Sequence, residues 1–289
     1  MLFRAIDYLT LIYLGILSLL IAIFHFRLDN WIFYLAIHAL YILIVVIIIY
    51  LRQKTKSRII HFLRDTYPLL SIGFFYKELE GLIHIVFPGC FDFLINRLEL
   101  KVFGVYPTVW LQGIVSPGLT EFFVYFYSSY YFIVIISALA LYIPNRKEEF
   151  HEFSVNLMLA YYICFIVFVL FPVEGPRFAL ESFYTIPLKG YAFSKMHAQH
   201  MDTGFISAYR GAAMPSSHIA ATFVSLIMMR RYKRRLYYLI FPIFTLMVLS
   251  TVYGRYHYVS DAVAGVIVGW LSIFLISRYQ NRKKNKDLI

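Results

Sequence analysis

The feature that most limits the fold of this chain is a series of apolar stretches, each about long enough to cross a lipid bilayer. A membrane-spanning helix needs roughly 20 predominantly apolar residues. Hydrophobic residues make up 61% of the 289 positions and charged residues 15%, whereas soluble domains are about half apolar and a quarter charged. The sequence therefore predicts an all-α, polytopic integral membrane bundle. Its clear spans are Tyr8–Phe26, Trp31–Leu51, Phe122–Ile143, Phe153–Phe171, Ala212–Met229, Leu236–Tyr253 and Tyr258–Ile276.

A further crossing depends on the stretch Tyr67–Asn96. It is apolar, but charged residues, a proline and a glycine interrupt it between positions 77 and 89. Such a stretch can be an imperfect span, a re-entrant segment or an interfacial helix. The residues that follow it, Arg97–Glu121, contain several glycines and prolines and are expected to form an aromatic loop. The predicted total is seven to eight transmembrane segments.

Basic residues are concentrated in four blocks, at 52–58, 146–147, 230–235 and 278–286. Short loops rich in Lys and Arg remain in the cytoplasm. All four blocks share that side if Tyr67–Asn96 crosses once, which places both termini in the cytoplasm. Whether or not that stretch crosses, the last four spans place the loop 172–213 and the turn 254–257 together on the non-cytoplasmic side. Because topology explains the net charge of +11, no nucleic-acid partner is expected.

Three regions follow from this distribution. Residues 1–121 are predicted to form a transmembrane hairpin plus a re-entrant or interfacial segment, residues 122–277 a transmembrane core, and residues 278–289 a basic cytoplasmic tail. No small-residue cleavage pattern follows the first apolar run, which indicates a retained span rather than a signal peptide. The two cysteines, Cys90 and Cys164, have no metal-binding spacing, and Cys164 is expected to be buried.

Three short polar stretches fall at the ends of the last four spans. They are 175–178 (Gly-Pro-Arg-Phe), 214–218 (Met-Pro-Ser-Ser-His) and 254–261 (Gly-Arg-Tyr-His-Tyr-Val-Ser-Asp). His257 precedes Asp261 by four residues, which places both side chains on one face of a helix. A carboxylate there can hold the imidazole in one tautomer and support a positive charge on it. This arrangement suits a histidine nucleophile.

The same stretches are suited to binding phosphate. Pro215 is expected at the start of a helix, where free N–H groups and the helix dipole attract anions. Ser216 and Ser217 add donors, and Arg177 and Arg255 offer forked donors for phosphate oxygens. Each feature also has an ordinary explanation, since a Pro-Ser-Ser start is a common cap and an arginine beside a span usually faces headgroups. Their shared location at one face favours the phosphate site.

Together these motifs resemble the type 2 phosphatidic acid phosphatase (PAP2) superfamily of membrane histidine phosphatases and lipid phosphotransferases. The resemblance covers roughly Phe122–Ile276 and implies a PAP2-like core in the C-terminal half. It implies that His257 forms a phosphohistidine, that His218 is the acid for the leaving group, and that Asp261 orients His257. It also implies that neither a metal nor another cofactor takes part. The phosphate would be held by Arg177, Ser216, Ser217 and Arg255.

The chain departs from the family pattern at three positions. Ser217 stands where the second motif usually has glycine, Leu170 where the first has lysine, and Thr251 where the third has arginine. Arg255 lies two residues before His257 instead, and on one continuous helix these side chains would point about 200° apart. Arg255 can therefore serve only from a turn between the last two spans. These features are most similar to the branch that includes inositol phosphorylceramide synthases, so hydrolysis and headgroup transfer both stay open.

The long loop 172–213 adds candidate headgroup contacts. His197, His200 and Asp202 form a cluster that could bind a metal, but its spacing matches no specific site, and contact with phosphorylated headgroups is expected instead. Glu174 is expected to contact a polar acceptor or to pair with Arg177.

The expected activity is that of an integral membrane enzyme acting on a lipid phosphate or phospholipid. Water as the acceptor would make it a lipid phosphatase, and a lipid alcohol such as ceramide would make it a phosphotransferase. A non-enzymatic transporter is the alternative class. It would require charged residues at mid-membrane or broken helices in matched halves, and the seven clear spans show neither.

Overall fold

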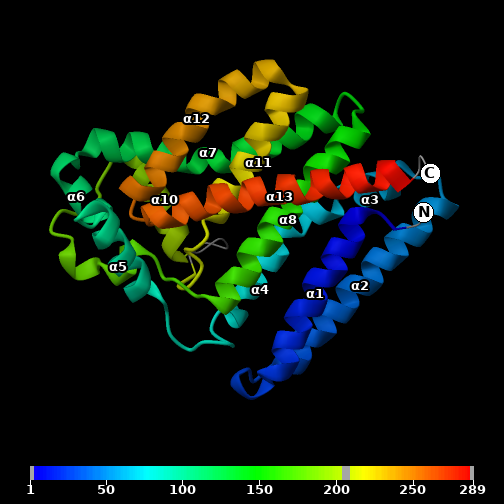
Figure 1. Cartoon of the computed structure of the whole chain (residues 1–289), viewed down its shortest axis with the longest axis horizontal. Helices are drawn as coiled ribbons and strands as arrows, with labels where there is room; N and C mark the ends of the chain where they lie inside the picture. The colour runs from blue at the N-terminus through cyan, green and yellow to red at the C-terminus, as the bar shows by residue number, and fades with distance from the viewer. Residues whose placement is uncertain (1–2, 204–208, 287–289) are drawn as a thin grey trace.

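The computed structural model describes residues 3–203 and 209–286, with the side chains of residues 200–203 and 283–286 left out of that description. The described residues form an all-α bundle, as predicted (Figure 1). Within them, six helices are long and apolar enough to cross a membrane. These are α1 (Ala5–Ile23), α2 (Trp31–Lys54), α7 (Pro117–Tyr142), α8 (Lys147–Leu170), α12 (Arg234–Tyr253) and α13 (Val259–Lys286).

The remaining helices are shorter. Helix α11 packs against α8, α12 and α13 and has 16 residues, so the total of seven to eight spans stays a prediction. The shorter α-helices are α3 (Arg58–Leu70), α4 (Ile72–Leu82), α5 (Asp92–Phe103), α6 (Pro107–Trp110), α9 (Pro176–Ala179), α10 (Ala192–Thr203) and α11 (Ser217–Tyr232).

The ambiguous stretch Tyr67–Asn96 forms parts of three helices. Helices α3 and α4 are separated at Ser71, and each has a side-chain contact with α1. Arg64 of α3 pairs with Asp7 near the start of α1. At the other end, Arg27 in the turn between α1 and α2 donates a 2.6 Å hydrogen bond to the Val86 carbonyl oxygen.

The expected loop over 97–121 is wrong, because helices occupy most of it. Helix α5 continues to Phe103, and α7 begins at Pro117 rather than at Phe122. The side chain of Ser116 caps α7 by accepting a hydrogen bond from the Leu119 N–H, and proline at the first helical position favours this start. The cap therefore starts the helix within a segment whose glycines and prolines had predicted a loop.

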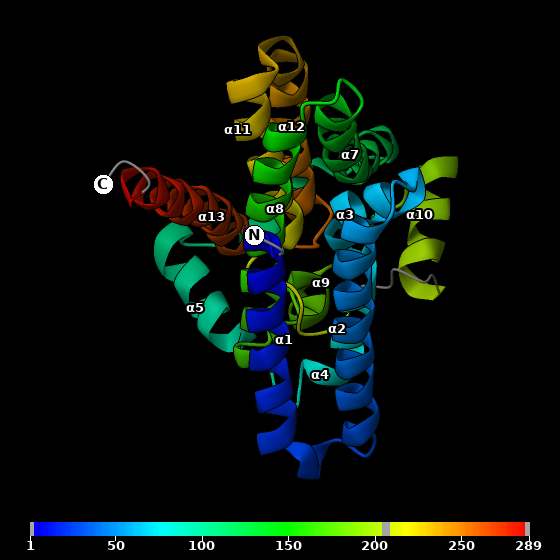
Figure 2. The ribbon, with the colours of Figure 1, turned by 90° about the vertical axis from the view of Figure 1, so that its right-hand side faces the viewer.

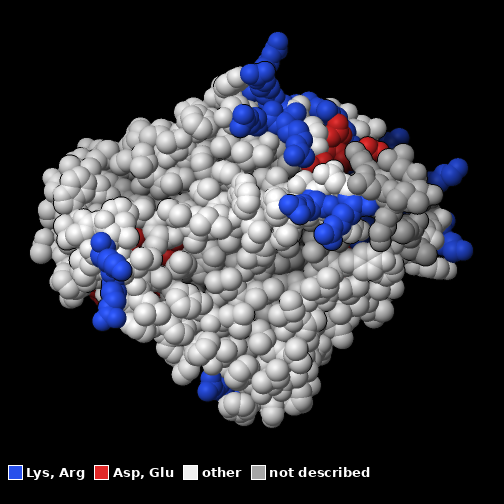
Figure 3. Space-filling model, in the orientation of Figure 1, with Lys and Arg blue, Asp and Glu red and all other residues white. Residues whose placement is uncertain are grey.

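The basic blocks gather at one end of the bundle. Arg146 donates to the Tyr232 carbonyl oxygen, and Lys147 and Arg4 both pair with Asp65. Figure 3 shows Lys and Arg concentrated on the side where Figure 1 places both termini, over an otherwise largely uncharged face. Helices α8 and α12 begin at this end, and α7, α11 and α13 end there. The turn 254–258 and the described ends of the connection between α8 and α11, at 171–175 and 209–216, therefore lie at the opposite end.

The core is built around α8, which packs against α1, α7, α11 and α13. Helices α1 and α2 form a hairpin beside it (Figures 1 and 2). Cys164 of α8 is fully buried, as predicted. Helices α11 and α13 approach most closely at glycines. A Cβ atom on Gly265 would lie 2.6 Å from the Ser216 carbonyl oxygen, and one on Gly269 would lie 2.9 Å from that of Ala220. Small residues permit such contacts between membrane helices.

Removing the Asp7 carboxylate should destabilise the basic end of the bundle. Asp7 is buried and accepts hydrogen bonds from Arg64 and from the Tyr67 hydroxyl. Asp7→Ala leaves a buried guanidinium uncompensated, which costs about 3–5 kcal/mol. Thermal unfolding in detergent should show a lower Tm for Asp7→Ala than for Asp29→Ala, which removes an exposed carboxylate. Equal Tm values would contradict this assignment.

Candidate active site

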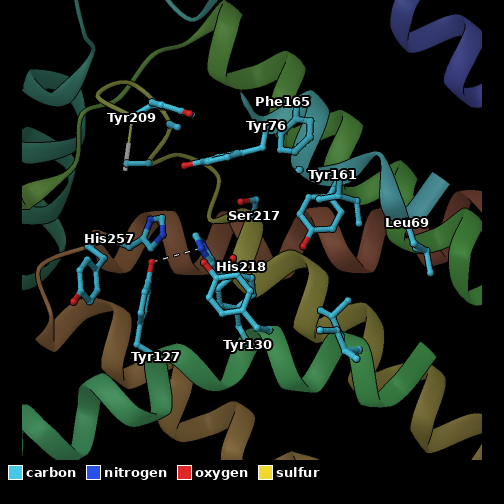
Figure 4. A pocket seen from close by; sticks show the side chains of 18 of the residues that line it. Leu69, Tyr76, Tyr127, Tyr130, Tyr161, Phe165, Tyr209, Ser217, His218 and His257 are labelled. Carbon is cyan, nitrogen blue, oxygen red and sulfur yellow. Dashed lines mark hydrogen bonds between the residues drawn. The ribbon is translucent and has the colours of Figure 1, made fainter. Parts of the chain in front are cut away.

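The three polar stretches meet at one cavity of about 420 Å³ (Figure 4). They come from the connection between α8 and α11, from the start of α11, and from the turn between α12 and α13. Around them the lining is mostly aromatic and aliphatic. The polar residues that line this cavity from the three stretches and their surroundings are Glu174, Arg177, Ser217, His218 and His257.

His257 lies directly against Asp261. Its Nδ1 atom is 3.4 Å from Oδ2 of Asp261. This is an ion-pair contact and not a hydrogen bond. Both side chains are buried, and the carboxylate also accepts a 2.9 Å hydrogen bond from the Tyr258 N–H. Because Nδ1 faces the carboxylate, Nε2 is the nitrogen directed away from it.

The two residues do not share a helix as the spacing predicted. Helix α12 ends at Tyr253, a turn follows, and α13 begins only at Val259. The turn includes Arg255 with φ of +60°. Backbone N–H groups of Tyr256 and His257 both donate to the Thr251 carbonyl oxygen, which ties the turn to the end of α12. The contact between His257 and Asp261 therefore forms across the first turn of α13.

His218 faces His257 from the first turn of α11. The centroids of the two imidazole rings are 5.8 Å apart. Nε2 of His218 is 3.5 Å from the Tyr127 hydroxyl, and the Tyr130 ring packs edge-on at 4.2 Å (Figure 4). Within the described part of the chain, Nδ1 of His218 and Oδ1 of Asp261 are buried without a hydrogen-bond partner.

The two predicted phosphate-binding serines occupy different positions. Ser216 is fully buried and caps α11 by accepting a hydrogen bond from the Ile219 N–H. Ser217 is the first helical residue and lines the cavity. Pro215 therefore precedes the cap and is not the first helical residue as predicted. The first turn of α11, with its free N–H groups, lies at this end of the cavity. The helix dipole there favours an anion.

The stretch around Arg177 is held by backbone contacts. Val173 forms an isolated β-bridge with Ala212, which joins this stretch to the segment before α11. Gly175 has φ of +95° and ψ of 161°, and a Cβ atom there would lie 3.1 Å from the Tyr256 carbonyl oxygen and 3.2 Å from Cβ of Ala213. The first stretch therefore lies against Tyr256 of the third and against Ala213, the residue just before the second, and Arg177 follows on the short helix α9.

Gly175→Ala should distort the site. Its backbone conformation is nearly exclusive to glycine and costs of order 1–3 kcal/mol for other residues, and the added methyl group would displace the 254–258 turn. We expect a lower Tm and a loss of turnover of about tenfold or more. Gly113→Ala is the control, because a Cβ atom there would meet nothing within 4 Å. Unchanged turnover in Gly175→Ala would show that the three stretches tolerate separation.

Arg255 lies in the turn between α12 and α13, as its use in the site requires, but it lines a second cavity. Its Nη2 donates a 2.7 Å hydrogen bond to the Ile186 carbonyl oxygen, and its guanidinium stacks 3.9 Å from the centroid of the Tyr184 ring. Burial lowers the pKa of Arg255 from its usual value. This second cavity, of about 340 Å³, shares Arg177 and Tyr256 with the first. The two cavities therefore meet at Arg177.

Two carboxylates of α5, which the sequence analysis did not single out, support the site. Asp92 accepts hydrogen bonds from the N–H groups of Glu174 and Gly175 and from the Tyr258 hydroxyl, at 2.8–3.1 Å. Glu99, seven residues further on, accepts from the backbone N–H and the hydroxyl of Ser260 at the start of α13. Burial raises the pKa of the Glu99 carboxyl. The seven-residue spacing of two acids on one helix face was the available sequence signal.

The candidate headgroup contacts take different positions. Glu174 lines the cavity and pairs with Arg210 at 3.5 Å. His197 of α10 packs against α7, with its ring 5.4 Å from that of Tyr127 and Nδ1 3.4 Å from the Ser128 hydroxyl. The side chains of His200 and Asp202 lie outside the described residues. In the part of the chain that the structure describes, no group of three or more His, Cys, Asp or Glu side chains is placed to hold a metal ion.

His218 and the buried His257 therefore lie at one end of membrane-length helices, with Asp261 behind His257 and Arg177 lining the same cavity. The chain belongs to the PAP2 superfamily, whose family model matches residues 97–275. Members of this superfamily are generally phosphatases or phosphotransferases. Comparisons with curated proteins and with solved structures give no match.

Proposed function

We propose that the protein is a metal-independent lipid phosphatase or phosphotransferase that acts through a phosphohistidine. The observation that carries the proposal is the arrangement of His218, His257 and Asp261 around the polar end of the cavity, next to Arg177. The cavity lies among membrane-length helices and most of its lining is apolar, which suits a lipid substrate. Independence from metal follows from the family resemblance and is part of the proposal.

In the first step, Nε2 of His257 attacks the phosphorus atom, and the bond from phosphorus to the leaving oxygen breaks. Protonated His218 gives its proton to that oxygen, so the lipid alcohol leaves neutral. Asp261 stabilises the positive charge that develops on the His257 ring. Arg177, the Ser217 hydroxyl and the N–H groups at the start of α11 bind the phosphoryl oxygens.

In the second step, water or a lipid alcohol attacks the phosphohistidine. His218 takes the proton of the attacking hydroxyl group, and the bond from phosphorus to Nε2 of His257 breaks. Water releases inorganic phosphate. A lipid alcohol such as ceramide receives the phosphoryl group, or the complete phosphorylated headgroup when the donor is a phospholipid.

Transfer of the inositol phosphorylceramide synthase type is the alternative that one observation favours. The second cavity adjoins Arg177 and contains Arg255, Tyr184 and Glu181. A headgroup attached to the phosphate on His257 would extend past Arg177 into this polar space. In this form of the proposal Arg255 contacts the headgroup or its phosphate from the second cavity.

Purified protein in lipid, with a chelator present, tests the proposal. Phosphatidate, a prenyl diphosphate, or phosphatidylinositol with ceramide would be supplied, while free phosphate and new lipids are followed together. Phosphate release supports a hydrolase, and a new phosphorylated lipid without phosphate release supports a transferase. Activity that appears only after metal is added would overturn the metal-independent mechanism.

The proposed topology places the site on the non-cytoplasmic side and both termini in the cytoplasm. It rests on the basic blocks, which lie at the end of the bundle opposite His218 and His257, together with the tendency of basic loops to stay inside. A small-molecule thiol reagent that cannot cross membranes should label a cysteine introduced at exposed Lys189 in intact cells. A cysteine introduced at exposed Arg235 should be labelled only after the membrane is opened.

A further inference from the structure

The cavity continues from the two histidines along one face of α7. Tyr127, Tyr130, Val134 and Ala138 line it at spacings of three and four residues, which places them in a row on the helix. Eleven residues separate the first from the last, and at the rise of an α-helix this corresponds to about 16 Å. The cavity is therefore an elongated channel with its ionisable groups at one end. Figure 4 shows Leu69 at the opposite end from His257.

The wall that faces α7 comes from α3 and α4. Leu69, Leu70 and Gly73 line the channel on this side, and Tyr161 and Phe165 of α8 form its floor. Helices α3, α4 and α7 each pack against α8. The channel lies between them.

The channel opens at the apolar surface of the bundle. The side chains at its mouth are exposed, Leu70 by 63% and Ile135 by 54%. They belong to α3 and α7. Because α7 is a membrane-length helix, the hydrocarbon interior of the bilayer would surround this mouth. A molecule with one charged end and one apolar end would fit this channel without leaving the membrane.

We infer that this channel, here called the tail channel, binds the hydrocarbon chain of the lipid phosphate, and that α3 and α4 determine which chain length is accepted. The inference rests on the proposed function, because it assigns the phosphate of the same molecule to the histidines. Its basis is the continuity of one cavity from Arg177 to Leu69 and Leu70, since each buried methylene group adds to binding. Helices α3 and α4 lie outside the residues 97–275 that match the family model.

Gly73 provides the steric test. It lines the tail channel, and a Cβ atom there would meet nothing within 4 Å. Gly73→Leu should therefore extend a side chain into the channel without disturbing its neighbours. Gly15→Leu is the matched control, because Gly15 is also exposed, helical and free of contacts, but lies on α1 away from the channel.

The experiment measures binding and turnover on the same detergent-solubilised protein. A non-hydrolysable lipid phosphonate with a photoactivatable group near the end of its chain is cross-linked to the wild type and both variants, with eight-carbon and eighteen-carbon chains. In the wild type, cross-links of the eighteen-carbon probe that excess unlabelled phosphonate removes should fall on residues 69–73 and 134–138. Gly73→Leu should reduce long-chain cross-linking at least tenfold and leave short-chain cross-linking within twofold, and Gly15→Leu should change neither.

Two outcomes separate the inference from the function on which it rests. Competable cross-links outside α3, α4 and α7, or equal long-chain labelling in both variants, would overturn the tail channel, whether or not the enzyme turns over lipid phosphates. The expected cross-links in a protein that turns over no lipid phosphate would support the channel and overturn the proposed chemistry.

Discussion

His257→Ala should reduce turnover by at least about 10³-fold while the protein remains folded. The substitution removes the nitrogen that is proposed to attack phosphorus. Without it the phosphohistidine intermediate cannot form. The His257 side chain is buried and pairs with Asp261, and the variant keeps the hydrogen bond from the backbone N–H of residue 257 to the Thr251 carbonyl oxygen. Turnover of the lipid substrate would be measured together with Tm in detergent.

Thr251→Ala is the matched control for this experiment. Thr251 is also fully buried near the turn, but its hydroxyl bonds locally to the Val248 carbonyl oxygen. The backbone oxygen that anchors the turn is retained in the variant. We expect turnover within a few-fold of the wild type. Full turnover in His257→Ala would rule out the phosphohistidine mechanism, and a comparable loss in Thr251→Ala would show that packing around the turn accounts for the result.

Asp92→Ala should reduce both stability and turnover, although Asp92 lines neither of the two cavities. The substitution leaves the buried Gly175 N–H and the Tyr258 hydroxyl without their acceptor. Each unsatisfied buried group costs about 1–3 kcal/mol. A shift of about 1 Å in the adjoining Arg177 and His257 can reduce turnover about 100-fold. The measurements are Tm in detergent and kcat with KM.

Asp92→Asn distinguishes positioning from general instability. Its amide oxygen can still accept hydrogen bonds from the backbone, so the variant should recover part of kcat, while KM stays near that of the wild type. Tyr258→Phe removes one of the three hydrogen bonds and should have an intermediate effect. Lower Tm without any change in kcat for Asp92→Ala would show that Asp92 stabilises the fold without positioning the site.

The long spans were predictable because each depends on local composition. About 20 consecutive apolar residues are sufficient evidence for a crossing, and most predicted boundaries lie within a few residues of the helix ends. The structure of segment 67–96 was not predictable. Two short helices meet there at Ser71, and their backbone groups are satisfied through tertiary contacts that a short stretch of sequence does not reveal. The start of α7 was missed because the Ser-Pro sequence that caps this helix is also typical of loops.

Contacts within the site were predictable between residues close in sequence. Contacts between residues far apart in sequence were not. The pairing of His257 with Asp261 follows from a four-residue spacing, although a helix was expected where the structure has a turn. Glu174 was expected to contact an acceptor or to pair with Arg177; it lines the cavity and pairs with Arg210, and contact with an acceptor stays a prediction. The role of Asp92 depends on contacts with residues more than 80 positions away. Such partners are defined by tertiary packing alone.

The glycine contacts between α11 and α13 have a consequence for how the protein responds to its surroundings. His218 lies in the first turn of α11 and Asp261 in the first turn of α13, and Gly265 brings α13 against the Ser216 carbonyl oxygen. The distance between His218 and Asp261 is therefore determined by a backbone contact between the two helices, with no flexible side chain between them. Bilayers of different thickness tilt or bend membrane helices, but this pair would move as one body. The proposed chemistry should then be insensitive to membrane thickness, even where access to the channel is not.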